Sequence, residues 1–124
     1  MSSPCSHAAP LFVAALLGAS LVACGKSQPA SAEVTYARRC APCHGPAGRG
    51  DGPGAAGLLP PPRSFHDEAW RRAASPEHLA AVIREGGARH GLSPAMPAHG
   101  DLTPDEVRGL VDLLRRMGSA ENQP

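Results

Sequence analysis

The segment Cys40-Ala41-Pro42-Cys43-His44 decides how this chain can fold. Two cysteines separated by two residues and followed directly by a histidine are typical of the covalent attachment site of a c-type haem. The spacing fits the chemistry, because two thiols can add to the two vinyl groups of one porphyrin while the adjacent imidazole is held beneath the iron. The segment therefore predicts one haem c, bound through Cys40 and Cys43, with His44 as an iron ligand.

Other uses of Cys40 and Cys43 compete with this interpretation. A zinc site would need further thiolate or imidazole ligands, and the sequence has no second C-x-x-C. A thioredoxin-like redox pair would need a βαβ context, which the sequence does not indicate. A disulfide between the two cysteines is conceivable in an oxidising compartment, but it would leave the composition of the core unexplained.

The composition indicates a protein core that is too small without a cofactor. The chain has 124 residues, enough for one domain, and only 3% of them are aromatic. The large rings are Phe12, Tyr36, Phe65 and Trp70, whereas 14 glycines and 14 prolines bring the composition close to that of disordered chains. The net charge of +1, with no long run of one sign, argues against nucleic acid as a partner.

The N-terminal part of the sequence is typical of an exported lipoprotein. Residues 11–23 form an uncharged apolar stretch that fits a signal peptide and is too short to span a bilayer comfortably. The stretch ends in Leu21-Val22-Ala23-Cys24, which resembles the bacterial lipobox, so we expect cleavage before Cys24 and lipidation of that residue. The alternative is cleavage after Ala30-Ser31-Ala32, an A-x-A-like site, which would leave a soluble periplasmic protein.

We accordingly divide the chain into four segments: a lipoprotein-type signal peptide at 1–23, a flexible tether at 24–31, the folded domain at 32–119 and a disordered tail at 120–124. Within the domain, three segments are predicted to be helical. The first runs from Ser31 to about Cys40, and the second starts at Ser75 with a proline in its first turn and ends at Gly86-Gly87. The third starts at a capping box and ends at Gly118.

The segments between these helices, 45–63 and 86–100, are long and rich in glycine and proline, without strand alternation. Loops of this length inside a compact domain are usually functional, and both could wrap a ligand. The prediction is an all-α domain whose core is completed by the haem.

Residues 32–117 resemble a class I cytochrome c of the bacterial monohaem lipoprotein type. The resemblance rests on CAPCHGPAGRGDGPGAAGLLPPPR at 40–63, GLSPAMP at 91–97 and the flanking helices. It implies a small fold in which the N- and C-terminal helices cross and long loops wrap one haem. At that crossing the family often pairs a glycine with an aromatic residue, where this sequence offers Ala32 and Leu113.

The resemblance also implies a methionine ligand opposite the histidine, which here would be Met96. This residue stands between Pro94 and Pro97, in a stiff loop suited to holding a thioether at a fixed distance from iron. Met117 lies on the apolar stripe of the last helix and is expected to pack in the core. Histidine ligation is the alternative, and the candidate histidines are His66, His78, His90 and His99.

Four further residues have expected roles near the haem. By resemblance, the Pro53 carbonyl accepts the second ring N–H of the ligand histidine. Arg63, after three prolines, could donate hydrogen bonds to a haem propionate. Phe65 and Trp70 are expected to pack on the haem.

These features predict a one-electron carrier rather than an enzyme. The expected location is the periplasmic face of a bacterial membrane, with Cys24 as the lipid anchor and redox proteins such as an oxidase, reductase or dehydrogenase as partners. One alternative is a haem enzyme or small-ligand sensor with an open or exchangeable sixth iron position. Another is a dedicated subunit docked to one oxidoreductase.

Overall fold

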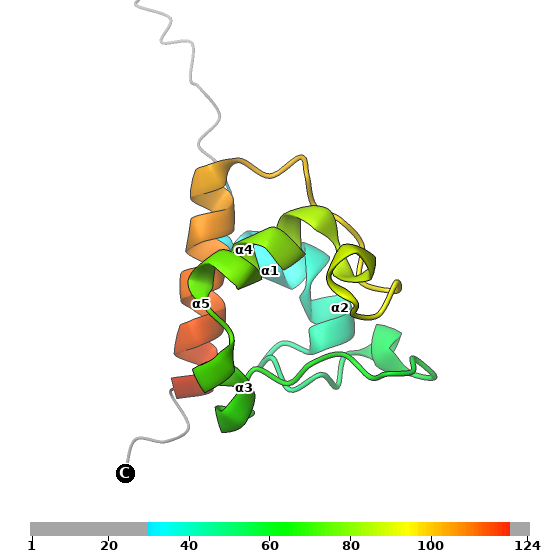
Figure 1. Ribbon diagram of the computed structural model, residues 1–124. Coiled ribbons are helices and arrows are strands. Elements are labelled where there is room, and N and C mark those ends of the chain that lie inside the picture. Colours follow the sequence, from blue (N-terminus) through cyan, green and yellow to red (C-terminus); the bar gives the residue numbers. More distant parts are fainter. Residues whose placement is uncertain (1–29, 120–124) are drawn as a thin grey trace, which may run out of the picture.

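A computed structural model describes residues 30–119, and this part of the chain is entirely helical, as the sequence predicts (Figure 1). It contains five α-helices and two short 3-10 helices: α1 (Ala32–Arg39), α2 (Ala41–His44), η1 (Pro53–Ala55), α3 (Glu68–Ala73), α4 (Pro76–Glu85), η2 (Gly87–His90) and α5 (Pro104–Ser119). The predicted signal peptide and tail, and Cys24, lie outside the described residues. Within residues 30–119, no helix is long and apolar enough to cross a membrane.

The ends of the predicted helices are fixed by side-chain caps. At α4, the Ser75 hydroxyl accepts a hydrogen bond from the His78 backbone N–H at 3.1 Å, and Pro76 occupies the first turn. At α5, Thr103 Oγ1 accepts from the Glu106 N–H at 3.3 Å, and Glu106 Oε2 accepts from the Thr103 N–H at 2.9 Å. This reciprocal pair is the capping box that the sequence predicts.

Helix α3 was not predicted from the sequence; it lies between the predicted loop at 45–63 and the helix that starts after Ser75. The Asp67 carboxylate caps this helix by accepting from the Trp70 backbone N–H at 3.1 Å. Arg71 and Arg72 lie in its last turn, where positive charge complements the helix dipole. These are ordinary helix signals, but a helix of six residues carries too little apolar periodicity to stand out.

Helix α5 forms one side of the domain, and α1, α4 and α3 all contact it (Figure 1). The crossing of α1 and α5 differs from the prediction in one partner. Ala32 does lie at the crossing, but the α5 residue facing it is Gly109, where an added Cβ would stand 3.4 Å from the Ala32 Cβ. A glycine in the middle of a helix costs about 1 kcal/mol relative to alanine. A Cβ at Gly109 would only reach van der Waals contact with Ala32, so the crossing leaves room for an alanine there.

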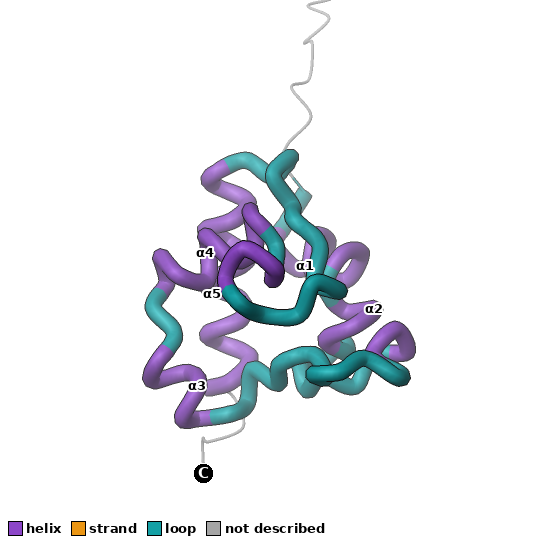
Figure 2. Tube along the Cα trace, turned by 45° about the vertical axis from the view of Figure 1, so that its right-hand side comes forward, coloured by secondary structure: helices purple, strands orange, loops and turns teal. Residues whose placement is uncertain are grey.

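The apolar core lies between α5 and the helices that contact it. Its centre is Leu110, which is 1% exposed. The other buried apolar residues are Tyr36, Phe65, Ala74, Leu79, Val82, Ile83, Leu102, Val107, Val111, Leu113 and Leu114. Helix α2 and the loop that follows it lie on the side away from α5, where Figure 2 shows long loops joined by short helical turns. The core thus lies on the α5 side of the domain, and the C-x-x-C-H segment borders it, because Cys40 and Ala41 pack against the core cluster.

Candidate haem site

The two cysteines lie at the start of α2, directly after α1. Cys40 is both the last cap of α1 and the first cap of α2, and both thiols are free. Burial raises the pKa of Cys40 to about 11, with Arg39 opposing the shift. The thiol therefore stays protonated at neutral pH. Among the described residues, no group of three histidine, cysteine or acidic side chains gathers at a distance that could hold a metal ion.

His44 ends α2 and is oriented by one backbone group. Its Nδ1 lies 2.9 Å from the carbonyl oxygen of Arg63. Because a carbonyl only accepts, Nδ1 must carry the hydrogen, and the lone pair of a neutral ring is then on Nε2. Burial lowers the pKa of His44, although the Arg63 carbonyl opposes the shift, so the neutral form is favoured. An imidazole held in this tautomer is ready to bind a metal through Nε2.

This hydrogen bond corrects the role expected for Pro53. The carbonyl that holds the His44 ring belongs to Arg63, which is 19 residues downstream, whereas Pro53 begins η1. The Arg63 side chain is half exposed and lies 3.5 Å from the Asp67 carboxylate. Its guanidinium remains a candidate for a propionate contact. The Arg63 backbone has a separate function, because its carbonyl orients the His44 ring.

Phe65 packs on the histidine. Its ring stacks on His44 with centroids 4.7 Å apart and planes 20° apart, and it is 5% exposed. The Trp70 ring also contacts that of Phe65, with ring centroids 5.5 Å apart and planes tilted by 39°. Among the contacts described here, both aromatic residues therefore support the histidine side of the site.

Close backbone packing fixes α2 against the loop that follows. A Cβ at Gly52 would lie 2.3 Å from the Pro42 carbonyl oxygen, and one at Gly54 would lie 3.2 Å from Cys43 Sγ. The buried Tyr36 hydroxyl donates to the Gly45 carbonyl at 2.7 Å. Two glycines and one tyrosine thus keep the cysteines and the histidine in a set arrangement, and the tyrosine was not recognised from the sequence.

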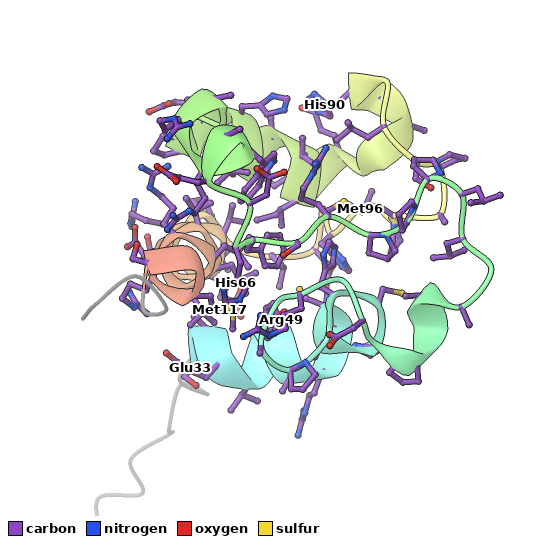
Figure 3. The ribbon with its side chains drawn as sticks, turned by 90° about the horizontal axis from the view of Figure 1, so that it is seen from below. Glu33, Arg49, His66, His90, Met96 and Met117 are labelled. Carbon is purple, nitrogen blue, oxygen red and sulfur yellow. The ribbon has the colours of Figure 1, made fainter. Side chains whose placement is uncertain are left out.

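Met96 lies in a loop that is fastened to the end of α4. Its carbonyl accepts from the Gly87 N–H at 3.0 Å, and its N–H donates to the Ser93 carbonyl at 3.2 Å. A Cβ at Gly87 would lie 2.2 Å from the Ser93 oxygen and 3.2 Å from the Met96 Cβ, so only glycine fits there without a shift. Figure 3 shows Met96 well apart from Met117, which lies near His66 and Glu33 at the end of α5.

The other candidate ligands contact protein groups of their own. Met117 packs against the core, and its sulfur would lie 3.2 Å from a Cβ at Gly48. His66 Nε2 lies 2.7 Å from the Ala47 carbonyl oxygen. His90 Nε2 lies 3.1 Å from a Glu85 carboxylate oxygen, and its ring contacts that of His78 at a centroid distance of 5.5 Å.

His99 lies beside the ion pair of Arg39 and Asp101, whose nearest atoms are 2.7 Å apart. Burial lowers the pKa of His99, and the Arg39 charge lowers it further. Its backbone N–H donates to the Ile83 carbonyl at 3.0 Å. Of the two methionine candidates, Met117 packs against the core, whereas Met96 lies on a loop whose backbone is held by Gly87 and Ser93.

The donor set fits a haem c. Two free thiols one helical turn apart, an imidazole with its Nδ1–H satisfied, and a thioether on a clamped loop are what covalent attachment and iron ligation need. The glycines beside α2 and Met96 provide close approach of the backbone, which larger residues would prevent.

A small all-helical domain with the cysteines and histidine on one short helix and a methionine on a loop defines a c-type cytochrome. The family model described as cytochrome c oxidase, cbb3-type, subunit III matches residues 27–114. The chain belongs to this cytochrome c family. A c-type cytochrome holds haem c covalently, and electron transfer by that haem is its general function.

A solved structure gives the same result for the fold. The c-type cytochrome KustC0563 is similar to this chain with a TM-score of 0.54 and 29% sequence identity, over 71% of this chain and 98% of that one. None of the curated protein sequences matches the chain. The class I cytochrome c fold expected from the sequence is therefore confirmed.

Proposed function

We propose that the protein is a one-electron carrier with a single haem c, ligated by His44 and Met96, and that it is not an enzyme. The observation that supports this most directly is the pair of backbone clamps on the two ligands. Arg63 holds His44 through its carbonyl at 2.9 Å, and Gly87 holds the Met96 backbone at 3.0 Å. Ligands fixed in this way favour an iron whose coordination does not change with oxidation state.

The bound haem would supply exchange of one electron between iron(II) and iron(III). The chain contributes the rest. Arg63 keeps His44 in the tautomer that binds through Nε2, and the stacked Phe65 ring restricts rotation of the imidazole. The Met96 thioether would fill the position that oxygen or peroxide needs, which disfavours the haem enzyme or sensor alternative.

We further propose that the carrier works at the periplasmic face of a bacterial membrane, anchored through lipidated Cys24. Its partners would be respiratory redox proteins. The description of the matched family makes a terminal oxidase the first partner to test, whether the protein exchanges electrons with it freely or remains docked to it as a subunit.

The test of the proposed function is Met96→Ala in the full chain. Loss of the thioether should remove its absorption band from the ferric spectrum, lower the midpoint potential and let the ferrous protein bind carbon monoxide. The matched control is Met117→Ala, which should cost about 2 kcal/mol of stability because a core side chain is removed, without changing the spectrum.

Retention of the thioether band in Met96→Ala would overturn the assignment, and so would its loss in Met117→Ala. A bis-imidazole spectrum in both variants would make His90 or His99 the sixth ligand.

A further inference from the structure

A recess lies between α3 and the C-terminal end of α5, on the side of the domain away from the Met96 loop. Its volume is about 360 Å³, and its walls include Trp70, three arginines and Glu68. The three arginines are Arg71, Arg72 and Arg115. Figure 1 shows α3 beside the last turns of α5. Trp70 and Arg115, which are 45 positions apart in the sequence, therefore line the same recess.

The three arginines are held at the recess by contacts with the protein, and together they carry more charge than Glu68, the acidic residue in its walls. Arg115 Nη1 donates to the Ala74 carbonyl at 3.2 Å, which holds its guanidinium at the recess. Arg71 lies across Gly118, where a Cβ would meet Arg71 Cδ at 2.3 Å, and its buried Nε has no hydrogen-bond partner among the described residues. Arg72 pairs with Glu68. Three guanidinium groups and one carboxylate leave a net charge of +2.

Complementarity to the helix dipoles explains why α3 and α5 end in basic residues. It does not explain why side chains from two helices converge around the indole of Trp70. A positive recess with an aromatic wall is a suitable site for an acidic group, because Arg binds carboxylates through paired hydrogen bonds.

Trp70 also connects the recess to the iron ligand. The Trp70 and Phe65 rings have centroids 5.5 Å apart, and Phe65 stacks on His44 at 4.7 Å. Three aromatic rings are therefore in contact one after another, from the wall of the recess to the histidine. Because electronic coupling falls steeply with the width of the gaps between groups, a series of touching rings is a favourable route.

We propose that this recess docks a redox partner through an acidic patch of that protein, and that Trp70 and Phe65 couple the docked partner to His44. This inference rests on the proposed function as an electron carrier. In each transfer one electron passes between the haem iron and the oxidised or reduced metal centre of the partner, so that one metal loses what the other gains. No bond forms or breaks, and no proton moves.

The first experiment measures binding without electron transfer. Hexacyanochromate(III), a redox-inert paramagnetic anion, is added to the reduced holoprotein at low ionic strength, and its effect on the NMR spectrum is followed. The chain contains one tryptophan, so its indole N–H signal reports on the recess alone. We expect strong, selective broadening of this signal that salt reverses, because exposed charges are screened beyond about 10 Å at 0.1 M salt.

The charge of the recess is then removed with Arg71→Gln combined with Arg115→Gln, which should abolish the broadening. Arg89→Gln is the matched control, since Arg89 is an exposed arginine in η2, beside the Met96 loop. Broadening confined to residues of the Met96 loop, with the indole unaffected, would overturn the proposal.

The second experiment measures transfer to ferricyanide, which takes one electron from the ferrous protein and becomes ferrocyanide. The double arginine variant should react roughly tenfold more slowly at low ionic strength, as loss of electrostatic steering predicts. Trp70→Leu should also slow the reaction, whereas Trp70→Phe, which keeps an aromatic ring, should retain most of the rate.

Each variant is first checked for an unchanged ferric spectrum and midpoint potential. Suppose that the spectra and potentials are unchanged, and that Arg89→Gln slows the reaction with ferricyanide whereas the recess variants do not. Electrons then pass at the Met96 side, so the docking inference is wrong while the proposed function stands. A wild-type protein without the thioether band would contradict the proposed function instead.

Discussion

Tyr36 shows at the scale of one residue how the fold holds the haem motif. The residue is 3% exposed, and its hydroxyl donates to the carbonyl of Gly45, directly after His44. Burial, the largest cause, and the nearby Asp51 raise the pKa of Tyr36 from about 10 to about 12. The phenol is therefore kept protonated by the folded state.

The sign of the resulting pH dependence follows from linkage. Since the folded pKa is above the unfolded one, the contribution of Tyr36 to stability is complete below about pH 10 and is lost as the pH rises to about 12. We expect this loss in chemical denaturation measured across that range. The sequence contains one tyrosine, so a tyrosinate signal in ultraviolet resonance Raman spectra reports its titration directly.

Tyr36→Phe is the control for that prediction. It should flatten the pH dependence between 10 and 12 and cost about 0.5–1.5 kcal/mol at neutral pH, the usual worth of one hydrogen bond. A tyrosinate signal that grows in around pH 10 in the folded protein would contradict the assignment.

Some residues of the candidate site can be predicted from the sequence, and others cannot. The cysteines, His44 and Met96 have side-chain chemistry that can be read from their letters and spacing. The carbonyl that orients His44 cannot, because every residue has a carbonyl and only the path of the chain brings that of Arg63 to within 2.9 Å. Gly109 could have been noticed, since a glycine inside a strongly amphipathic helix often marks a packing contact, and here it faces Ala32.

At the scale of elements, the contact between η2 and the Met96 loop carries a prediction. In Gly87→Ala the new methyl group would lie 2.2 Å from the Ser93 carbonyl oxygen, so the loop must move and the Met96 backbone loses its clamp. We expect a weaker thioether band and measurable binding of carbon monoxide to the ferrous protein, followed by absorption spectroscopy.

Gly91→Ala provides the comparison. This glycine has a φ of +67°, but a Cβ there meets nothing within 4 Å. The substitution should cost about 1 kcal/mol through backbone strain and leave the iron coordination as it is. Equal effects of the two substitutions on carbon monoxide binding would show that the loop is not held by Gly87.

The helices themselves were predictable in proportion to their caps and length. The capping box at Thr103 and the serine-proline start at Ser75 identify α5 and α4, because each satisfies backbone groups that a helix end leaves open. Helix α3 was not predicted because it has only six residues and is stabilised by packing against α5. A contact with a distant segment of the chain leaves no pattern in the local sequence.

For the whole molecule, the small core predicts dependence on the haem. Twelve apolar residues are buried in the described part of the chain, whereas ordering the backbone costs roughly 1–2 kcal/mol per residue. Cys40→Ala combined with Cys43→Ala should leave a largely disordered or degraded chain, as judged by circular dichroism and protease resistance. Cooperative unfolding of this variant near the midpoint of the holoprotein would show that the protein core is sufficient.

The predicted anchor is tested on the whole chain as well. Cys24→Ser should release the protein from the membrane fraction, because stable anchoring needs two acyl chains and lipoprotein processing would attach them at Cys24. The spectrum of the released protein should be unchanged. Mass spectrometry that finds an unmodified N-terminus at Glu33 would favour cleavage after Ala30-Ser31-Ala32 and contradict the anchor.

The crossing of α1 and α5 has a consequence for the order of events during biogenesis. The domain is closed by contact between its first and last helices, through Ala32 and Gly109. Until the last helix meets the first, the chain is open around residues 40–44. The two thiols are then accessible to whatever attaches the porphyrin, and the contact between α1 and α5 closes the domain afterwards.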